Sequence, residues 1–242
     1  MSTPVVQFDN VTKVYRQGTV EVAALQGMGL SIEAGEFVAL WGPSGSGKTT
    51  ALNLIGALDT PTSGTVTLAG SNLSTLTRRQ LSALRRDQIG FVFQAYNLIP
   101  VLTAYENAEA VMALQGTPES KRRDHVMQLL EQVGLKGMEH RRPHEMSGGQ
   151  QQRVAIARAI ASNPAVVLAD EPTANVDSAT AEKLLRLMAD LNERHGTTFV
   201  FSTHDPRVMK YAKRLVGLVD GRVDSDQLKA QGDRVEPTAG DT

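Results

Sequence analysis

The stretch that decides the fold is Gly42-Pro43-Ser44-Gly45-Ser46-Gly47-Lys48-Thr49. It fits the pattern G-x-x-x-x-G-K-[ST], in which a glycine-rich loop cradles phosphate groups. The apolar run 37–41 before it is typical of a buried strand, and residues 50–55 after it can begin a helix. Because the motif requires a strand before it and a helix after it, the flanks favour a phosphate-binding α/β fold over a chance glycine turn.

The residue types of this loop suit a nucleoside triphosphate and Mg²⁺. Glycines remove the Cβ atoms that would keep the backbone away from the phosphates, and the N-terminus of the following helix favours negative charge. Lys48 carries a mobile charge that can reach the β- and γ-phosphates, and Thr49 offers a hydroxyl to Mg²⁺. We therefore expect the nucleotide to be bound by Gly42, Pro43, Ser44, Gly45, Ser46, Gly47, Lys48, Thr49 and Thr50.

The composition is that of a globular, nearly neutral chain. Of the 242 residues, 41% are apolar and 21% are charged, which predicts a packed core rather than disorder. The formal net charge of −1 argues against non-specific nucleic-acid binding, which needs clustered positive charge. The chain contains no cysteine, which excludes a disulfide framework, a thiolate metal site and a cysteine nucleophile.

The sequence contains no candidate membrane span. Residues 1–10 lack the pattern of a signal peptide, and no stretch approaches the roughly 20 apolar residues of a membrane helix. If the protein works at a membrane, we expect another chain to cross it. Residues 224–242 are polar and include Gly232, Pro237 and Gly240, so we expect a flexible C-terminal tail there.

The order of strand and helix patterns predicts a mostly parallel core sheet with helices on both faces. The core strands are expected at 37–41, 89–93, 165–170, 198–202 and 215–219, and the strand at 215–219 is expected to be the last. Short strands at 5–8, 29–33 and 65–68 are expected to form an antiparallel lobe beside this core. Helical patterns from about 95 to 163 interrupt the alternation and predict an inserted helical subdomain.

Two acidic residues, Asp170 and Glu171, follow the buried strand predicted at 165–170. At the carboxyl end of a strand they lie where ligands bind in open α/β sheets. Asp170 can bind Mg²⁺, and Glu171 can polarise or deprotonate an attacking water. The alternative is a solvated acidic turn, but the phosphate loop in the same chain favours the catalytic interpretation.

A second glycine-rich run, Ser147-Gly148-Gly149-Gln150-Gln151, precedes a helix predicted at 150–161. Ser147 is a good N-cap, and the glycines leave N–H groups open for an anion. Taken alone, the run is more typical of an ordinary capped helix after a glycine turn. A binding role is favoured because the same chain contains the phosphate loop, Gln94, this run and His204, in that order.

Residues 4–223 closely resemble the nucleotide-binding subunits of ABC transporters. The specific mark is Met146-Ser147-Gly148-Gly149-Gln150, which matches the family signature LSGGQ with Met in place of Leu. The resemblance implies a P-loop NTPase fold of the ABC cassette type, with a mostly parallel core sheet, an antiparallel β lobe and a helical subdomain. It also implies that the chain hydrolyses ATP with Mg²⁺.

The same resemblance assigns roles to single residues. Tyr15 matches the aromatic residue that stacks on adenine, although a packing role is the alternative. Gln94 matches the residue that contacts Mg²⁺ and water and senses the membrane partner, so the implied metal ligands are Thr49, Gln94 and Asp170. His204 matches the histidine that contacts the γ-phosphate, and the implied catalytic residues are Glu171, His204 and Gln94. Asp177, in the segment 174–177, belongs to the loop that touches the opposite subunit.

In such proteins the signature of one copy caps ATP held by the other copy's phosphate loop. The resemblance therefore implies an ATP-bound homodimer in which Ser147, Gly148, Gly149, Gln150 and Asp177 reach the partner's nucleotide. It also implies separate integral membrane permease subunits, no direct nucleic-acid partner, and a peripheral location on the cytoplasmic face of the inner membrane. Residues 95–100 and 105–114 are expected to form the groove for a permease helix, with ordinary subdomain packing as the alternative.

Segments 58–64, 90–94 and 97–100 are similar to the lipoprotein-releasing and macrolide-export branch, the LolD-like and MacB-like ATPases. That branch implies mechanotransmission, in which ATP cycles drive movements outside the membrane. The alternatives are an FtsE-like cell-division ATPase, a non-transport ABC ATPase of translation or DNA repair, and a module that holds ATP without turnover. The presence of Glu171 argues against the last of these.

Overall fold

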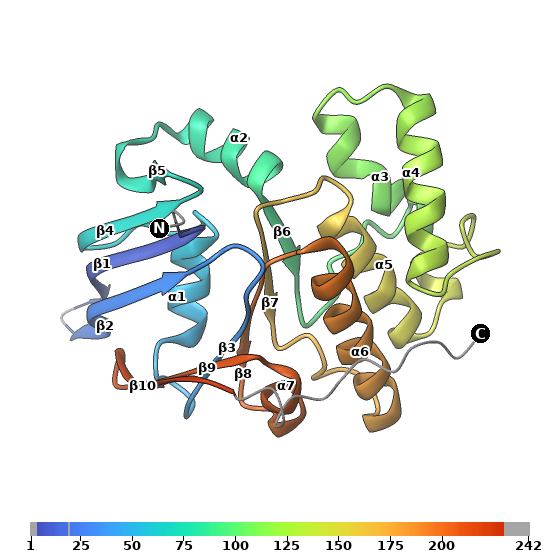
Figure 1. Cartoon of the computed structure of the whole chain (residues 1–242). Coiled ribbons are helices and arrows are strands. Elements are labelled where there is room, and N and C mark those ends of the chain that lie inside the picture. Colours follow the sequence, from blue (N-terminus) through green and yellow to red (C-terminus); the bar gives the residue numbers. More distant parts are fainter. Residues whose placement is uncertain (1–3, 19, 230–242) are drawn as a thin grey trace.

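The computed structural model describes residues 4–18 and 20–229, and its strands form two sheets (Figure 1). The larger sheet has six strands in the order β10-β9-β3-β8-β7-β6, and the smaller has four in the order β2-β1-β4-β5. The strands of the larger sheet are β3 (Phe37–Trp41), β6 (Ile89–Val92), β7 (Val166–Asp170), β8 (Phe199–Thr203), β9 (Arg214–Val219) and β10 (Arg222–Leu228). Those of the smaller sheet are β1 (Val6–Gln17), β2 (Val20–Ile32), β4 (Ser63–Leu68) and β5 (Ser71–Asn72).

The six-stranded sheet is the predicted mostly parallel core. Strand β3 pairs in parallel with β8 and β9, and β7 pairs in parallel with β6 and β8. Only β10 among these six strands runs antiparallel to its neighbour. The central strands are apolar along nearly their whole length because helices or the second sheet cover both faces. Their carboxyl ends therefore meet at one edge, which positions the site described below.

Strand β10 corrects two expectations. The strand at 215–219 is not the last, and the predicted tail does not begin at 224, because β10 continues to Leu228. It is a polar edge strand, held by a hairpin to β9 and by an ion pair in which Arg214 Nη2 lies 2.7 Å from Asp226 Oδ2. The remainder of the predicted tail, 230–242, lies outside the described residues.

The four-stranded sheet is antiparallel throughout, as predicted, but β1 and β2 are much longer than the strands expected at 5–8 and 29–33. The register of β1 against β2 shifts after Phe8, Val11 and Lys13. Each shift breaks the alternation of apolar and polar residues on which a strand prediction depends. The sequence pattern therefore revealed only the regular ends of this pair.

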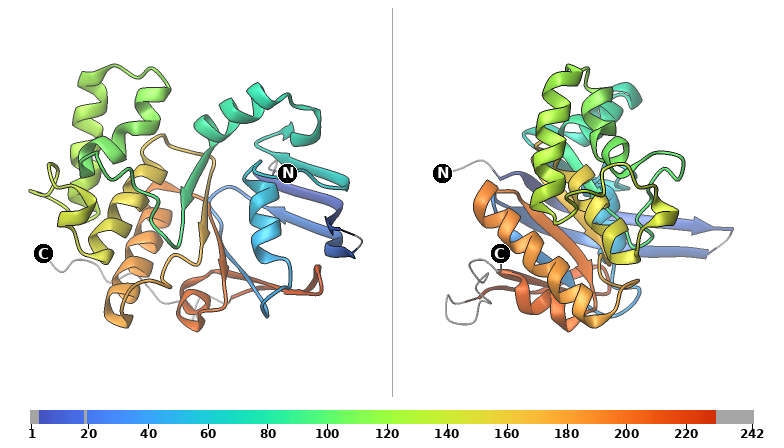
Figure 2. Two further views of the ribbon diagram at one scale, coloured as in Figure 1. Left: turned by 180° about the vertical axis from the view of Figure 1, so that it is seen from behind. Right: turned by 90° about the vertical axis from the view of Figure 1, so that its right-hand side faces the viewer.

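Two apolar clusters lie on opposite faces of the core sheet. On one face, side chains such as Phe37, Phe199 and Phe201 pack against the helical part of the chain. On the other, Val38, Leu40 and the neighbouring strands pack against α1 (Lys48–Ile55) and the antiparallel sheet. Figures 1 and 2 show α1 between the two sheets, with α5 (Gly148–Ile160) and α6 (Ser178–His195) beyond the opposite face of the core sheet.

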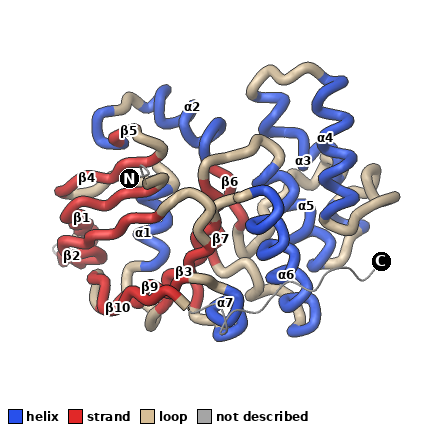
Figure 3. Tube along the Cα trace, in the orientation of Figure 1, coloured by secondary structure: helices blue, strands red, loops and turns tan. Residues whose placement is uncertain are grey.

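The remaining helices lie along the rim of the molecule (Figure 3). Helices α3 (Ala104–Leu114) and α4 (Glu119–Gln132) fall within the segment predicted as a helical subdomain, and α5 packs against both α3 and β6. Capping boxes begin α2 (Arg78–Gln88) at Thr77 and α3 at Thr103. The short elements are α7 (Pro206–Tyr211) and the 3₁₀ turns η1 (Leu73–Thr75) and η2 (Pro143–Glu145).

Candidate functional site

The phosphate loop connects β3 to α1 and has a backbone that only glycine tolerates at two positions. Gly42 and Gly47 have φ values of 146° and 102°. A Cβ atom at Gly42 would lie 2.2 Å from the carbonyl oxygen of Leu218, and one at Gly47 would lie 2.6 Å from that of Ala24. The loop thus packs tightly against neighbouring backbone. Since Gly47 offers no side chain to cap α1, no side chain competes with a ligand at that helix end.

Lys48 is the first residue of α1 and folds back over the loop. Its Nζ donates hydrogen bonds of 2.8 Å to the carbonyl oxygens of Gly42 and Pro43. Burial lowers the pKa of Lys48, while the charges of Glu171 and Asp170 act in the opposite direction. The ammonium is therefore held close to the loop, where a triphosphate would replace backbone carbonyls with stronger, charged acceptors.

Asp170 ends β7 opposite Ser202 of β8 and is half-buried. Burial raises the pKa of its carboxyl group, and the charge of Glu171 acts in the same direction. Its Oδ1 atom is buried and, within the described part of the chain, has no hydrogen-bond partner. A buried carboxylate oxygen without a donor is a good ligand for Mg²⁺, so the residues present fit this cation.

Glu171 and His204 are brought together by the pairing of β7 with β8. The distance from His204 Nδ1 to Glu171 Oε1 is 2.6 Å, and the Thr203 hydroxyl donates to Glu171 Oε2 at 3.3 Å. Glu171 has a φ of 46°, which is rare for a non-glycine residue and directs the chain sharply away from the strand. The predicted catalytic carboxylate and histidine are therefore adjacent.

Gln94 follows β6, the strand next to β7, and so lies at the same edge of the sheet. Its backbone carbonyl accepts a 2.9 Å hydrogen bond from Asn175 Nδ2. The contact between Gln94 Nε2 and Asn175 Oδ1 is longer, at 3.5 Å. Sequence reasoning did not anticipate Asn175 as a partner of Gln94, because the two are 81 positions apart.

Tyr15 lies on β1 and is fixed by two residues that sequence reasoning missed. Its hydroxyl donates to Asp59 Oδ2 at 2.9 Å, and the Nζ atom of Lys13 lies 4.8 Å from the centre of its ring. Lys13 in turn forms an ion pair of 2.6 Å with Asp59. Stacking of Tyr15 on adenine stays a prediction.

Ser147 caps α5 as predicted. Its side chain accepts a hydrogen bond from the backbone N–H of Gln150, whose side chain bonds back to the Ser147 N–H. Asp177 caps α6 by accepting from the N–H of Thr180, without the reciprocal bond found at α5. The residues of the second glycine run lie at the start of α5, and the phosphate loop leads into α1 on the other face of the core sheet. One chain therefore brings the phosphate loop, Asp170, Glu171, His204 and Gln94 to one edge, but holds its second glycine run on a separate element.

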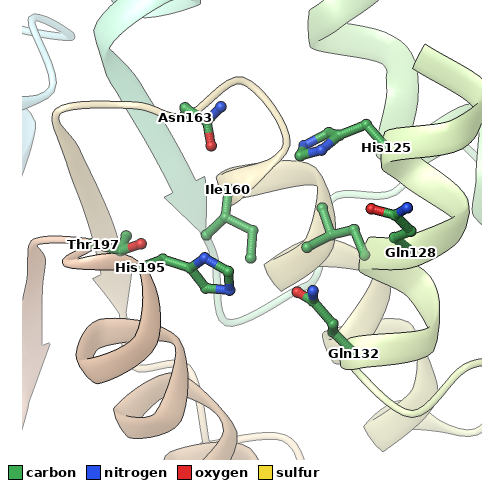
Figure 4. Close-up of a pocket in the computed structure, with 8 residues that line it drawn as sticks. His125, Gln128, Gln132, Ile160, Asn163, His195 and Thr197 are labelled. Carbon is green, nitrogen blue, oxygen red and sulfur yellow. The ribbon is translucent and has the colours of Figure 1, made fainter. Parts of the chain in front are cut away.

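Two hollows lie away from the phosphate loop. The first, which we call the β6 groove, has a volume of about 360 Å³ and is lined by Leu58, Phe91, Asn97, Val111, Leu114 and Arg158 among others. The second, of about 170 Å³, lies between α4 and the ends of α5 and α6, where His125, Gln128 and His195 point into it (Figure 4). The predicted site residues line neither of them.

A glycine-rich phosphate loop with a buried lysine, a strand-end carboxylate pair and a mostly parallel sheet together define a P-loop NTPase. The sequence profile of the family described as ABC transporter matches residues 25–174, and the chain belongs to this family. It is an ATP-binding cassette and an ATPase. Among residues 4–18 and 20–229, none of the helices combines the length and the apolar composition that crossing a membrane requires.

Similar proteins cover nearly the whole chain. It is 44% identical over 234 residues to the ABC transporter ATP-binding protein MJ0796 of Methanocaldococcus jannaschii, covering 95% of this chain and 100% of that protein. It is 48% identical over 227 residues to the lipoprotein-releasing system ATP-binding protein LolD of Anaeromyxobacter dehalogenans, covering 93% and 95%. The match to the macrolide export ATP-binding/permease protein MacB of Hyphomonas neptunium, at 45% identity, covers 96% of this chain but only 36% of that relative.

The solved structures of MJ0796 have the same fold. A dimeric structure of that cassette in a post-hydrolysis state, bound to ADP and phosphate, matches with a TM-score of 0.84 and covers 92% of this chain and 98% of that chain. A second dimeric structure of MJ0796 matches equally well. These comparisons confirm the predicted fold class and the predicted family.

Proposed function

We propose that this chain is the motor of an export or lipoprotein-releasing ABC transporter of the mechanotransmission type, hydrolysing ATP to drive separate permease subunits. The observation that carries the catalytic part is the contact of 2.6 Å between His204 and Glu171 beside the phosphate loop. Similarity to LolD and MacB supports the branch of the family.

The residues at the sheet edge can perform hydrolysis in defined roles. Lys48 and the loop N–H groups bind and orient the phosphates, and Glu171 accepts a proton from the attacking water. His204 fixes Glu171 through its Nδ1 and leaves the rest of its imidazole, which is 76% exposed, to contact the γ-phosphate. Mg²⁺ held by Thr49, Gln94 and Asp170 would neutralise charge on the β- and γ-phosphates.

The second half of the site is proposed to come from another copy of the chain. Ser147, Gly148, Gly149 and Gln150 start a helix on the face of the core sheet opposite α1, so they cannot close over this chain's own phosphates without rearrangement. In a dimer they would cap ATP on the partner, next to Asp177. The dimeric state of the MJ0796 structures supports this arrangement.

The β6 groove is proposed as the docking site of a permease helix at the cytoplasmic face of the membrane. It includes Asn97, Val111 and Leu114 from the segments predicted for this purpose. Its apolar side chains, such as Leu114 at 71% exposure, lie beside Arg85, Arg86 and Arg158. A short amphipathic helix with acidic residues on its polar side fits these features.

The catalytic assignment is tested with Glu171→Gln. The amide cannot accept the proton from water, so we expect phosphate release to fall by about 10²–10⁴-fold while ATP still binds. Phosphate release and binding of labelled ATP are measured on the same preparation. Turnover at the parent rate would remove Glu171 from its assigned role, whatever the subfamily.

A further inference from the structure

Tyr96 contacts three parts of the chain: α5 through Arg158, the loop at 174–177 and the start of α5 at Gly148. Its backbone N–H closes the turn that contains Gln94 by donating to the Phe93 carbonyl at 3.2 Å, and the next residue, Asn97, lines the β6 groove. Its phenol is half-buried, and burial raises the pKa of its hydroxyl, so that the group is a neutral hydrogen-bond donor. The contacts of its backbone and of its hydroxyl lead in different directions.

The backbone of Tyr96 is anchored to α5. Tyr96 and the next residue, Asn97, have φ values of 59° and 48°, a conformation that costs free energy in two successive non-glycine residues. The guanidinium of Arg158 holds this turn by donating to both carbonyl oxygens, at 2.9 Å in the case of Tyr96. Asn97 and Arg158 both line the β6 groove, so a ligand in the groove would contact the residues that hold this turn.

The hydroxyl of Tyr96 points to the parts of the chain proposed to face the partner copy. It donates to the backbone carbonyl of Asn175 at 3.1 Å, in the loop that leads to Asp177. A Cβ atom on Gly148 would lie 2.7 Å from the same hydroxyl, so the start of α5 packs closely against it. The side chain of Asn175 returns to the Gln94 carbonyl and closes the connection.

We propose that Tyr96 is a positioning residue, which couples the β6 groove to the loop at 174–177 and to the signature at Ser147–Gln150. The inference rests on the proposed function, because the coupling orders two surfaces that meet a second copy in the proposed dimer. Its physical basis is entropic: a loop at 174–177 and a helix start that are already held in place lose less freedom on dimerisation. Among the described residues, none of the hydrogen bonds of Tyr96 reaches the phosphate loop, so the ATP affinity of the monomer should not depend on its hydroxyl.

Tyr96→Phe tests the coupling, since it removes one oxygen atom and keeps the packing of the ring. The matched control is Tyr105→Phe, which removes a hydroxyl bonded at 3.0 Å to Glu109 on the same helix. Both are made in the full chain carrying Glu171→Gln. Sedimentation with MgATP gives the dimer dissociation constant, and titration of the dilute monomer gives the ATP affinity.

One hydrogen bond is worth a factor of roughly two to ten in an equilibrium constant, and a dimer contains two such links, so Tyr96→Phe is expected to weaken dimerisation about tenfold. The ATP affinity of the monomer should stay at its parent value in both variants, and Tyr105→Phe should leave the dimer constant unchanged. Each variant removes one hydrogen bond of the folded monomer, so the two should lower the melting temperature by a similar amount, about 2–4 °C. A dimer constant within twofold of the parent, or an equal loss in Tyr105→Phe, would overturn the inference. If the Glu171→Gln parent itself stays monomeric with MgATP, the proposed function fails rather than the coupling.

Discussion

The starts of α1 and α5 use the same local device, a glycine-rich stretch before a helix, with opposite results. At α1 the capping residue is Gly47, which donates no side-chain cap, and Lys48 is buried beside the loop. At α5 the helix is capped by its own Ser147 and Gln150, and this run contains no cation. The start of α1 leaves its backbone N–H groups open to an anion and adds the charge of Lys48. The start of α5 is capped by its own side chains and presents a polar surface. This contrast supports the proposal that the two are complementary halves of one site, since only the first has the features of a phosphate site by itself.

The largest expected effect comes from breaking the proposed catalytic pair, Glu171 and His204, beside the phosphate loop. His204→Ala removes the contact with Glu171 Oε1 and the proposed contact with the γ-phosphate. We expect kcat to fall by about 10²-fold or more, with little change in the ATP affinity of the monomer. Steady-state phosphate release at saturating ATP measures it. If kcat is unchanged, the pair is structural and not catalytic.

The next largest expected effect is on ATP binding by the phosphate loop. Lys48→Ala removes the only cation of the phosphate loop and should weaken ATP binding by about 10–100-fold, the range of one or two charge-assisted hydrogen bonds. The measurement is calorimetric titration with MgATP. The matched control is Lys136→Ala, whose lysine pairs with Glu131 of α4, away from the phosphate loop and from Tyr15. Equal losses in both variants would show that the cradle has no special role.

Ser147→Asp alters the second half without breaking its helix. Aspartate is as good an N-cap as serine, so α5 should keep its stability, while the new carboxylate would face the partner's phosphates. We expect unchanged ATP binding by the monomer and a dimer at least about tenfold weaker in the Glu171→Gln background. Sedimentation with MgATP reports the dimer. An unaffected dimer would place Ser147 away from phosphate.

The smallest effect concerns β10, far from either half. The hydrogen bond from Arg214 lowers the pKa of Asp226 below its ordinary value of 3.8. A lowered carboxyl pKa means that the ion pair stabilises the fold at neutral pH and that this contribution is lost only as the pH falls below about 4. Asp226→Asn should therefore lower the free energy of unfolding by about 0.5 kcal/mol at pH 7 and equally at pH 5. Denaturant titrations at the two pH values measure it, and a loss confined to pH 5 would contradict this assignment.

The sequence predicted those features whose determinants are local. The phosphate loop with its flanking strand and helix, the cap at Ser147 and the strand that ends at Asp170 each depend on a few neighbouring residues. Motif order in one chain was enough to identify the family.

What the sequence did not predict depends on contacts between distant residues. The sequence of β10 is polar and predicts a tail, whereas the structure holds this segment as a strand through the ion pair of Arg214 with Asp226. The bond from Tyr96 to Asn175 joins residues 79 positions apart, and no spacing rule anticipates it. The lengths of β1 and β2 were missed because register shifts disguise the alternation in β1.

If each ATP is enclosed by two copies, two chains that each lack a different half of the site should complement one another when they are mixed. In the Glu171→Gln background, a Lys48→Ala chain keeps its signature but loses its cradle, and a Ser147→Asp chain keeps its cradle but loses its signature. Sedimentation with MgATP should show monomers for each variant alone and dimers in the mixture, with one cradle and one signature completing each other. Dimers formed by the Ser147→Asp chain alone at the parent affinity, or none in the mixture while the parent dimerises, would contradict a site shared by two copies.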